Sequence, residues 1–96
     1  MPRGAPRLRT EQDQQNLVGP TVKATRKQLA LTQDALCARL ATATSGRWSP
    51  TIFDIYRIES QRRIVSDMEL LALAIALECD LYDLLGTTKE ATTLPG

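Results

Sequence analysis

Apolar residues recur three or four positions apart in several separate stretches between residues 17 and 86. This spacing gathers them on one face of an α-helix, because successive helical residues are turned by about 100°. The pattern predicts an all-α fold of five helices, which we place at about 19–29, from 33, from about 50, from 66 and at about 80–85. A long polar connection, which ends near Gly46, separates the second helix from the third.

Hydroxyl side chains mark three of the predicted helix starts, at Thr32, Thr51 and Ser66. Such a side chain at the N-cap accepts a hydrogen bond from a backbone N–H of the first turn. Ser66 is followed three residues later by Glu69, which makes a capping box, and Thr51 has Asp54 at the same spacing. Gly86 follows the last helix at the position where a left-handed residue closes a helix.

The fourth predicted helix contains the longest apolar run of the chain, residues 70–77. A helix that is apolar nearly all round is expected to lie at the buried centre of the domain. In the third predicted helix, three residues share one side and are expected to face the core: Ile52, Ile55 and Ile58. Glu59 falls at the edge of that side, where an unpaired carboxylate would be costly. It therefore requires a cationic partner, for which Arg26 on the first helix is our candidate.

The opposite side of the third helix carries Phe53 and Arg57. Exposed helix faces seldom display Phe, whereas helices that read DNA often display Arg. Phe53 can touch a thymine methyl group, and Arg57 can hydrogen bond to the edge of a guanine. Packing of Phe53 against Trp48, in the preceding loop, explains the same residue without DNA. The sequence leaves both interpretations open.

With 96 residues, the chain has room for one domain with a single modest core. We place a helical domain at residues 17–86, between a flexible basic N-terminal arm at 1–16 and a disordered C-terminal tail at 87–96. The positive charge of the arm comes from Arg3, Arg7 and Arg9. The arm either reaches around DNA into the minor groove or forms a solvated leader.

Charge is distributed unevenly along the chain, although the formal net charge is only +1. Residues 17–63 carry eight basic and three acidic side chains, whereas residues 64–86 carry five acidic and no basic ones. Such a division indicates a polyanionic partner for the basic part. Chance clustering of charges in a small domain is the alternative.

What the sequence lacks argues against several classes of protein. There is no histidine, and the two cysteines, Cys37 and Cys79, form no metal-binding motif. We expect no metal, no cofactor and no enzymatic activity, since a phosphate-binding glycine loop is missing too. An apolar run of eight residues is far shorter than the roughly 20 that cross a bilayer. No signal peptide is recognisable, so we expect a cytoplasmic protein that does not enter the membrane.

The chain carries five motifs in order: Val22-Lys23-x-x-Arg26, Leu31-Thr32-Gln33-x-x-Leu36, Ile55-x-x-Ile58-Glu59, Ser66-Asp67-x-Glu69-Leu70-x-x-Leu73-Ala74-x-Ala76-Leu77 and Leu84-Leu85-Gly86. At this spacing, over about residues 18–86, the chain resembles the Cro and phage-repressor type of helix-turn-helix protein, also called the xenobiotic-response-element (XRE) family. Three features differ from the family pattern. The connection through residues 41–49 is longer, Ser60 stands where glycine is common, and the reading positions carry Ile and Phe.

The resemblance implies that the second and third helices form the helix-turn-helix motif and that the third helix enters the DNA major groove. The base-reading positions of the family correspond here to Thr51, Ile52, Phe53 and Arg57. Its phosphate-contacting positions correspond to Thr32, Gln33, Ser49, Arg62 and Arg63. The residue at the position of Gln33 also braces the reading helix. The buried ion pair of the family corresponds to Arg26 and Glu59.

We therefore expect a sequence-specific double-stranded DNA-binding transcriptional regulator, a repressor, that acts as a homodimer on two half-sites. The alternative is an antitoxin or other protein-interaction module on a helix-turn-helix scaffold, with a toxin or another protein as its partner. Phe53, Tyr56 and Trp48 would then form an apolar patch, and the acidic C-terminal region would meet a basic partner. The two roles are compatible.

Overall fold

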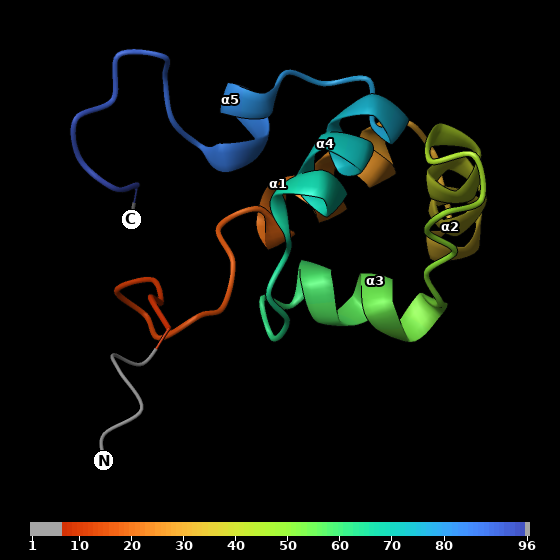
Figure 1. The fold of residues 1–96 in the computed structure, drawn as a ribbon, viewed down its shortest axis with the longest axis horizontal. Helices are drawn as coiled ribbons and strands as arrows, with labels where there is room; N and C mark the ends of the chain where they lie inside the picture. Colours follow the sequence, from red (N-terminus) through yellow and green to blue (C-terminus); the bar gives the residue numbers. More distant parts are fainter. Residues whose placement is uncertain (1–6, 96) are drawn as a thin grey trace.

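The computed structural model describes residues 7–95 and consists of helices and connecting loops, with no strand in that range (Figure 1). Its five helices are α1 (Gly19–Gln28), α2 (Gln33–Ala43), α3 (Ile52–Glu59), α4 (Asp67–Ala76) and α5 (Leu81–Leu85). The prediction of an all-α fold with five helices is confirmed. No helix in the described part of the chain is long and apolar enough to cross a membrane.

The predicted hydroxyl caps form at the starts of α2, α3 and α4. Thr32 Oγ1 accepts a hydrogen bond of 3.0 Å from a backbone N–H of the first turn of α2. In α3, the Thr51 hydroxyl and the Asp54 carboxylate each accept a bond from the other residue's backbone N–H. Ser66 and Glu69 make the same reciprocal pair in α4. Each hydroxyl cap stabilises its helix by about 1 kcal/mol, so three of the helix boundaries are fixed locally.

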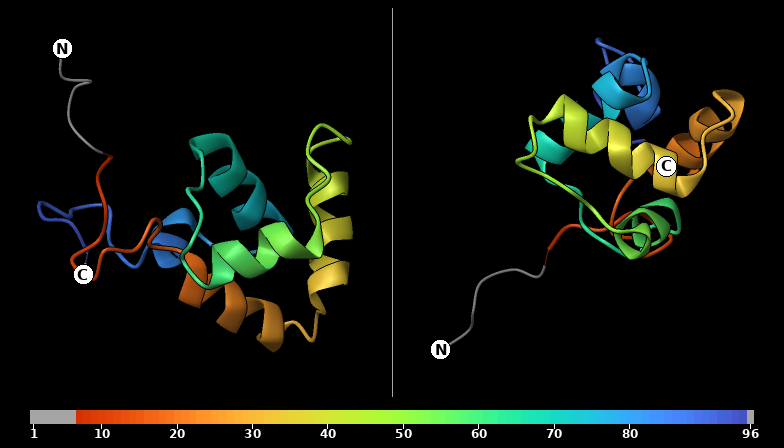
Figure 2. Two further views of the ribbon diagram at one scale, coloured as in Figure 1. Left: turned by 90° about the horizontal axis from the view of Figure 1, so that it is seen from below. Right: turned by 90° about the vertical axis from the view of Figure 1, so that its right-hand side faces the viewer.

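The core lies between the helices, where α2 packs against α3 and α4, and α1 packs against α3 and α5 (Figure 2). Every helix or its cap contributes to the largest fully buried side chains, which are Val22, Leu36, Leu40, Ile55, Ile58, Leu73, Leu77 and Leu84. Burying one such side chain stabilises the fold by about 1.5–3 kcal/mol. The shortest helix, α5, is anchored by Leu84 and is capped by Gly86, whose φ of 72° lies in the left-handed region.

The expectation that α4 is buried on nearly all sides is wrong. Leu73 and Leu77 are buried, but Met68, Leu71 and Ile75 are 70%, 52% and 56% exposed. These three follow a spacing of three and four residues, so they form one apolar row along α4. The helices that pack against α4 are α2 and α5. They cover other sides of α4 and leave this row exposed.

The expectation that all three isoleucines of α3 face the core is also wrong. Ile55 and Ile58 are fully buried, whereas Ile52 is 47% exposed. Ile52 is the first residue of α3 and lies nearly one turn ahead of the part that crosses the core. Helical spacing alone does not show that the first turn of α3 is less covered than the turn that carries Ile55 and Ile58.

The segment before α1 packs against the end of α3. Asn16, which is buried, donates from Nδ2 to the carbonyl oxygens of Ile58 and Arg63, 3.1 and 2.8 Å away, and its Oδ1 accepts from the N–H of Gly19. Gln15 donates its backbone N–H to the carbonyl oxygen of Gln61. These contacts join the last two residues of the predicted arm to the helical domain.

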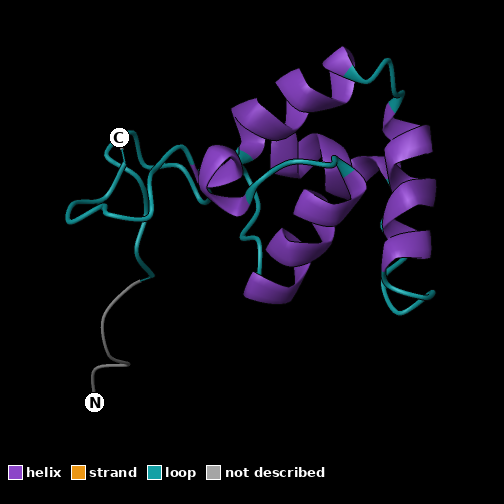
Figure 3. Cartoon of the chain, turned by 90° about the horizontal axis from the view of Figure 1, so that it is seen from above, coloured by secondary structure: helices purple, strands orange, loops and turns teal. Residues whose placement is uncertain are grey.

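The two terminal segments lie together at one end of the helices (Figure 3). Of the three arginines expected in the basic arm, Arg7 and Arg9 are exposed, and Arg3 lies outside the described residues. Arg9 forms an ion pair of 3.4 Å with Asp13 inside the same segment. The start of the chain in the described range is therefore close to α5 and to the tail that follows it.

Candidate nucleic-acid interface

The outward face of α3 displays large side chains that are not buried in the core. Phe53 is 78% exposed, and Ile52, Tyr56 and Arg57 are exposed beside it. Trp48, by contrast, is half-buried and packs against the core. Packing against Trp48 therefore does not account for Phe53. An eight-residue helix is about 12 Å long, so this face presents a compact set of apolar and cationic groups.

A buried ion pair holds the carboxyl end of α3 to α1. Arg26 donates from Nε to Glu59 Oε2 at 2.6 Å and from Nη2 to Glu59 Oε1 at 3.1 Å, and both side chains are buried. The remaining nitrogen, Nη1, donates to the carbonyl oxygen of Leu31 at 2.9 Å. The hydrogen bonds that Arg26 donates to Glu59 raise the pKa of its guanidinium, although burial alone would lower it.

Gln33 adds α2 to this network, because its Nε2 donates to Glu59 Oε1 at 3.2 Å. Glu59 on α3 thus accepts hydrogen bonds from side chains of both α1 and α2. This bond ties the start of α2 to the carboxyl end of α3. In the described part of the chain, no buried side-chain nitrogen or oxygen lacks a hydrogen-bond partner. The three helices are therefore oriented by a complete polar network rather than by apolar packing alone.

The backbone of α1 and the end of α3 approach so closely that Gly19 cannot carry a side chain. A Cβ atom at this position would overlap the carbonyl oxygen of Ile58 and would lie 2.8 Å from that of Glu59. Asn16 and Gly19 together position α3, yet sequence reasoning assigned them only to an arm and a helix start. The available signal was the Asn-x-x-Gly spacing, since an Asn side chain often bonds a backbone N–H a few residues later.

Asp54 connects the amino end of α3 to the outward Arg57. Its Oδ2 accepts from the N–H of Thr51 at 2.9 Å, and its Oδ1 accepts from Arg57 Nη2 at 3.0 Å. The N–H of Thr51, together with Arg57, holds the pKa of the Asp54 carboxyl below its ordinary value, against the effect of burial. Arg57 is therefore an exposed cation with a defined partner on its own helix.

Arg63 is engaged within the protein. Its Nη1 and Nη2 donate to the two carboxylate oxygens of Glu69, both at 2.9 Å. Its guanidinium lies 5.9 Å from the centre of the Trp48 ring, and its side chain is only 20% exposed. The charge of Arg63 is therefore already neutralised by a bidentate ion pair. This arrangement does not favour the phosphate contact that we expected from Arg63.

The other residues expected at phosphates lie at the start of α2 and in the two connections next to α3. Thr32 and Gln33 stand at the start of α2, which the bond to Glu59 ties to the carboxyl end of α3. Ser49 is exposed just before the amino end of α3, and Arg62 is exposed just after its carboxyl end. The structure thus brings exposed polar groups to both ends of the face that carries Phe53 and Arg57.

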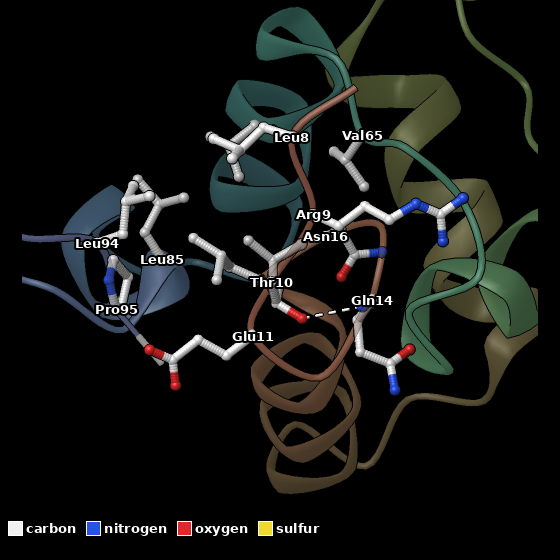
Figure 4. A pocket seen from close by; sticks show the side chains of 13 residues that line it. Leu8, Arg9, Thr10, Glu11, Gln14, Asn16, Val65, Leu85, Leu94 and Pro95 are labelled. Carbon is white, nitrogen blue, oxygen red and sulfur yellow. Dashed lines mark hydrogen bonds between the residues drawn. The ribbon is translucent and has the colours of Figure 1, made fainter. Parts of the chain in front are cut away.

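A pocket of about 340 Å³ lies between the N-terminal segment, α5 and the C-terminal tail (Figure 4). Most of its lining is apolar, with Leu8, Leu17, Leu70, Leu85 and Leu94. Its polar groups are partly engaged with one another, since Thr10 Oγ1 accepts from the N–H of Gln14 at 2.9 Å. No cluster of three or more metal-binding side chains occurs within residues 7–95.

The arrangement around α3 can position a short helix face against a ligand, with the cation of Arg57, held by Asp54, and several apolar groups at its surface. Comparisons of the chain with models of protein families, with curated proteins and with solved structures gave no match.

Proposed function

We propose that this protein is a sequence-specific double-stranded DNA-binding transcriptional regulator of the phage-repressor-like helix-turn-helix type, acting as a repressor. In this proposal α2 and α3 form the motif, and α3 enters the major groove. The observation that carries the proposal is the division of α3 into two faces. Its inner face is fixed by Ile55, Ile58 and Glu59, whereas its outer face exposes Phe53 and Arg57 without a structural role in the core.

The dimensions of α3 agree with this role. A helix of two turns fits lengthwise into the major groove, which is about 12 Å wide and deep enough to admit a helix. Arg57 would donate to the O6 and N7 atoms of a guanine. Phe53 and Ile52 would contact thymine methyl groups, and Thr51 would reach a base from the first turn.

Phosphate contacts would come from the groups at the two ends of α3. Thr32 and Gln33 would use the start of α2, where unpaired backbone N–H groups favour an anion. Ser49 and Arg62 would contact the backbone beside the amino and carboxyl ends of α3. The acidic side chains after residue 64 lie on α4 and α5, in the connection between them or in the C-terminal tail, so none of them belongs to α3. Such a protein would act in the cytoplasm.

The proposal includes a homodimer, because two copies would read two half-sites about 10 bp apart, on one side of the duplex. Selection from a random duplex library at a defined salt concentration tests the whole proposal. We expect enrichment of an inverted repeat and an affinity that falls as salt rises. Failure to enrich any sequence, together with salt-independent association in fluorescence anisotropy, would overturn it.

The exposed apolar row of α4 favours a second function, as an antitoxin or other protein-interaction module. Met68, Leu71 and Ile75 border a groove of about 380 Å³ that also includes Trp48 and Ala43. Rows of this kind on a small domain commonly mark a protein contact. Leu71→Glu should release a co-purifying partner such as a toxin, whereas Phe53→Ala should retain it. Equal retention by both variants would speak against this function.

A further inference from the structure

Arg63 lies in the loop between α3 and α4 and touches both helices. Besides its two bonds of 2.9 Å to Glu69, its Nε lies 3.9 Å from Asp54 Oδ1. The planar guanidinium also lies 5.9 Å from the centre of the Trp48 ring. Carboxylates on two helices and an aromatic ring on a third segment thus surround one side chain that is mostly buried.

The two acidic partners of Arg63 have the same structural role. Asp54 is the third residue of α3 and completes its capping box with Thr51. Glu69 is the third residue of α4 and completes its capping box with Ser66. Because each carboxylate already holds the first turn of its own helix, Arg63 joins the starts of the two helices to each other.

The contact with Asp54 extends this link to the outward face of α3. Asp54 Oδ1, which faces Arg63 Nε, is the same oxygen that accepts from Arg57 Nη2 at 3.0 Å. Charges therefore alternate along a continuous row, from Arg57 to Asp54, then to Arg63 and Glu69. Such a row limits the directions in which the long Arg57 side chain can point, because its end is held by a carboxylate that is itself held.

We propose that Arg63 is a positioning residue that orients Arg57 for base reading through Asp54, with Glu69 fixing Arg63 from α4. This role replaces the phosphate contact expected for Arg63 and rests on the DNA-binding function proposed above. It adds a specificity-determining residue that does not itself touch DNA. The neighbouring Arg62, which is exposed, keeps the role of a phosphate contact.

The two roles for Arg63 predict different behaviour on DNA. Removing a phosphate contact weakens binding to all sequences alike and lowers the salt slope by about one. Removing a positioning residue weakens binding to the selected operator but not to a scrambled duplex. Arg63→Lys separates the two, since lysine keeps the charge but cannot reproduce the bidentate planar contacts.

The experiment compares R63K, R63M and E69Q with the matched surface variant R62M, using anisotropy titrations on the selected operator and a scrambled duplex over a range of salt. We expect R63K and E69Q to lose about tenfold in the ratio of specific to non-specific affinity, with an unchanged salt slope on the scrambled duplex. R62M should weaken both duplexes and lower the slope. Wild-type behaviour of R63K, together with an R63M that matches R62M, would overturn the proposal.

A measurement on the free protein tests the positioning of Arg57 independently of whether the protein binds DNA. NMR relaxation of the Arg57 side-chain Nε–H group reports how far Arg57 is ordered without DNA. We expect ordering in the wild type, and loss of it in R63K and E69Q variants whose circular dichroism is unchanged. Should the wild type bind no DNA, the proposed function fails while this ordering can still be present. Unchanged Arg57 ordering in a folded R63K or E69Q protein overturns the positioning role itself.

Discussion

Arg26 on α1 and Glu59 on α3 are joined by two hydrogen bonds, of 2.6 and 3.1 Å, in a buried part of the domain. Breaking a buried pair from one side leaves an uncompensated charge, which typically costs 3–5 kcal/mol. We therefore expect Glu59→Gln to lower the free energy of unfolding by about 3 kcal/mol, as measured by urea denaturation followed by circular dichroism.

The double variant R26M/E59L provides the control for this prediction. Because it removes both charges and fills the site with apolar groups, it should be more stable than either single variant. A loss of less than about 1 kcal/mol in Glu59→Gln would show that water reaches the pair and screens it.

Gly19→Ala should destabilise the domain although alanine is the better helix former. The added Cβ would overlap the carbonyl oxygen of Ile58, so α1 and α3 would have to move apart. Overpacking of this kind costs about 1–3 kcal/mol, and the upper part of this range applies because the obstructing atoms are backbone oxygens. The expected cost therefore exceeds the gain of about 1 kcal/mol from helix propensity. Thermal unfolding checks the result against Lys23→Ala, at an exposed site of the same helix, which should be neutral. A raised melting temperature in Gly19→Ala would contradict the close approach.

Asn16→Ala should also destabilise the fold, because one side chain serves three backbone groups. Its loss leaves the carbonyl oxygens of Ile58 and Arg63 and the N–H of Gly19 without that partner. The Ile58 oxygen keeps a bond from the N–H of Gln61, and each group that is left unsatisfied costs about 1–3 kcal/mol before water compensates. Urea denaturation should show a loss of about 2 kcal/mol or more. Gln12→Ala, on the exposed turn of the same segment, should show none.

Stability should fall in acid through the two capping-box carboxylates of α3 and α4. The Thr51 N–H lowers the pKa of Asp54, and the Arg63 guanidinium lowers the pKa of Glu69. A carboxyl group whose pKa is lower in the folded state stabilises the fold above its unfolded pKa, near 4. That contribution is lost as the pH falls through the lower, folded pKa.

Melting temperatures measured between pH 7 and pH 2 check this dependence. We expect the wild type to lose stability below about pH 4, and D54N and E69Q to start lower and change less with pH. Parallel curves for the wild type and both variants would assign the acid sensitivity to other groups.

On DNA, Arg57→Ala should weaken binding to the selected operator by about 1–3 kcal/mol and relax the preference at one base pair. The reason is that a bidentate contact with guanine distinguishes it from the other bases. Lys89→Ala, in the C-terminal tail, is the matched removal of one positive charge and should leave the preference intact. Anisotropy titrations with single-base variants of the operator measure both effects. An unchanged base preference in Arg57→Ala would remove Arg57 from the reading positions.

Local chemistry made parts of this structure predictable. The hydroxyl caps at Thr32, Thr51 and Ser66 depend on residues three positions apart, and all three form. The pairing of Arg26 with Glu59 followed from helical periodicity, since a carboxylate at the edge of an apolar face requires a cation.

Features that depend on a second element were not predictable in the same way. Periodicity shows which residues share a face of α4, but it does not show whether another helix covers Leu71 and Ile75. Likewise, the sequence shows that Arg63 is cationic. Only the path of the loop brings its guanidinium to Glu69 instead of leaving it at the surface.

The two faces of α3 also separate substitutions that affect folding from substitutions that do not. Substitutions at Ile55, Ile58 or Glu59 alter the core, so they are tolerated only if the protein still folds. Substitutions at Phe53 leave the core untouched. Under the proposed function, single substitutions on the outer face would change the binding preference without loss of the folded protein. The same division gives the protein engineer an eight-residue cassette whose outer positions can be randomised on an unchanged scaffold.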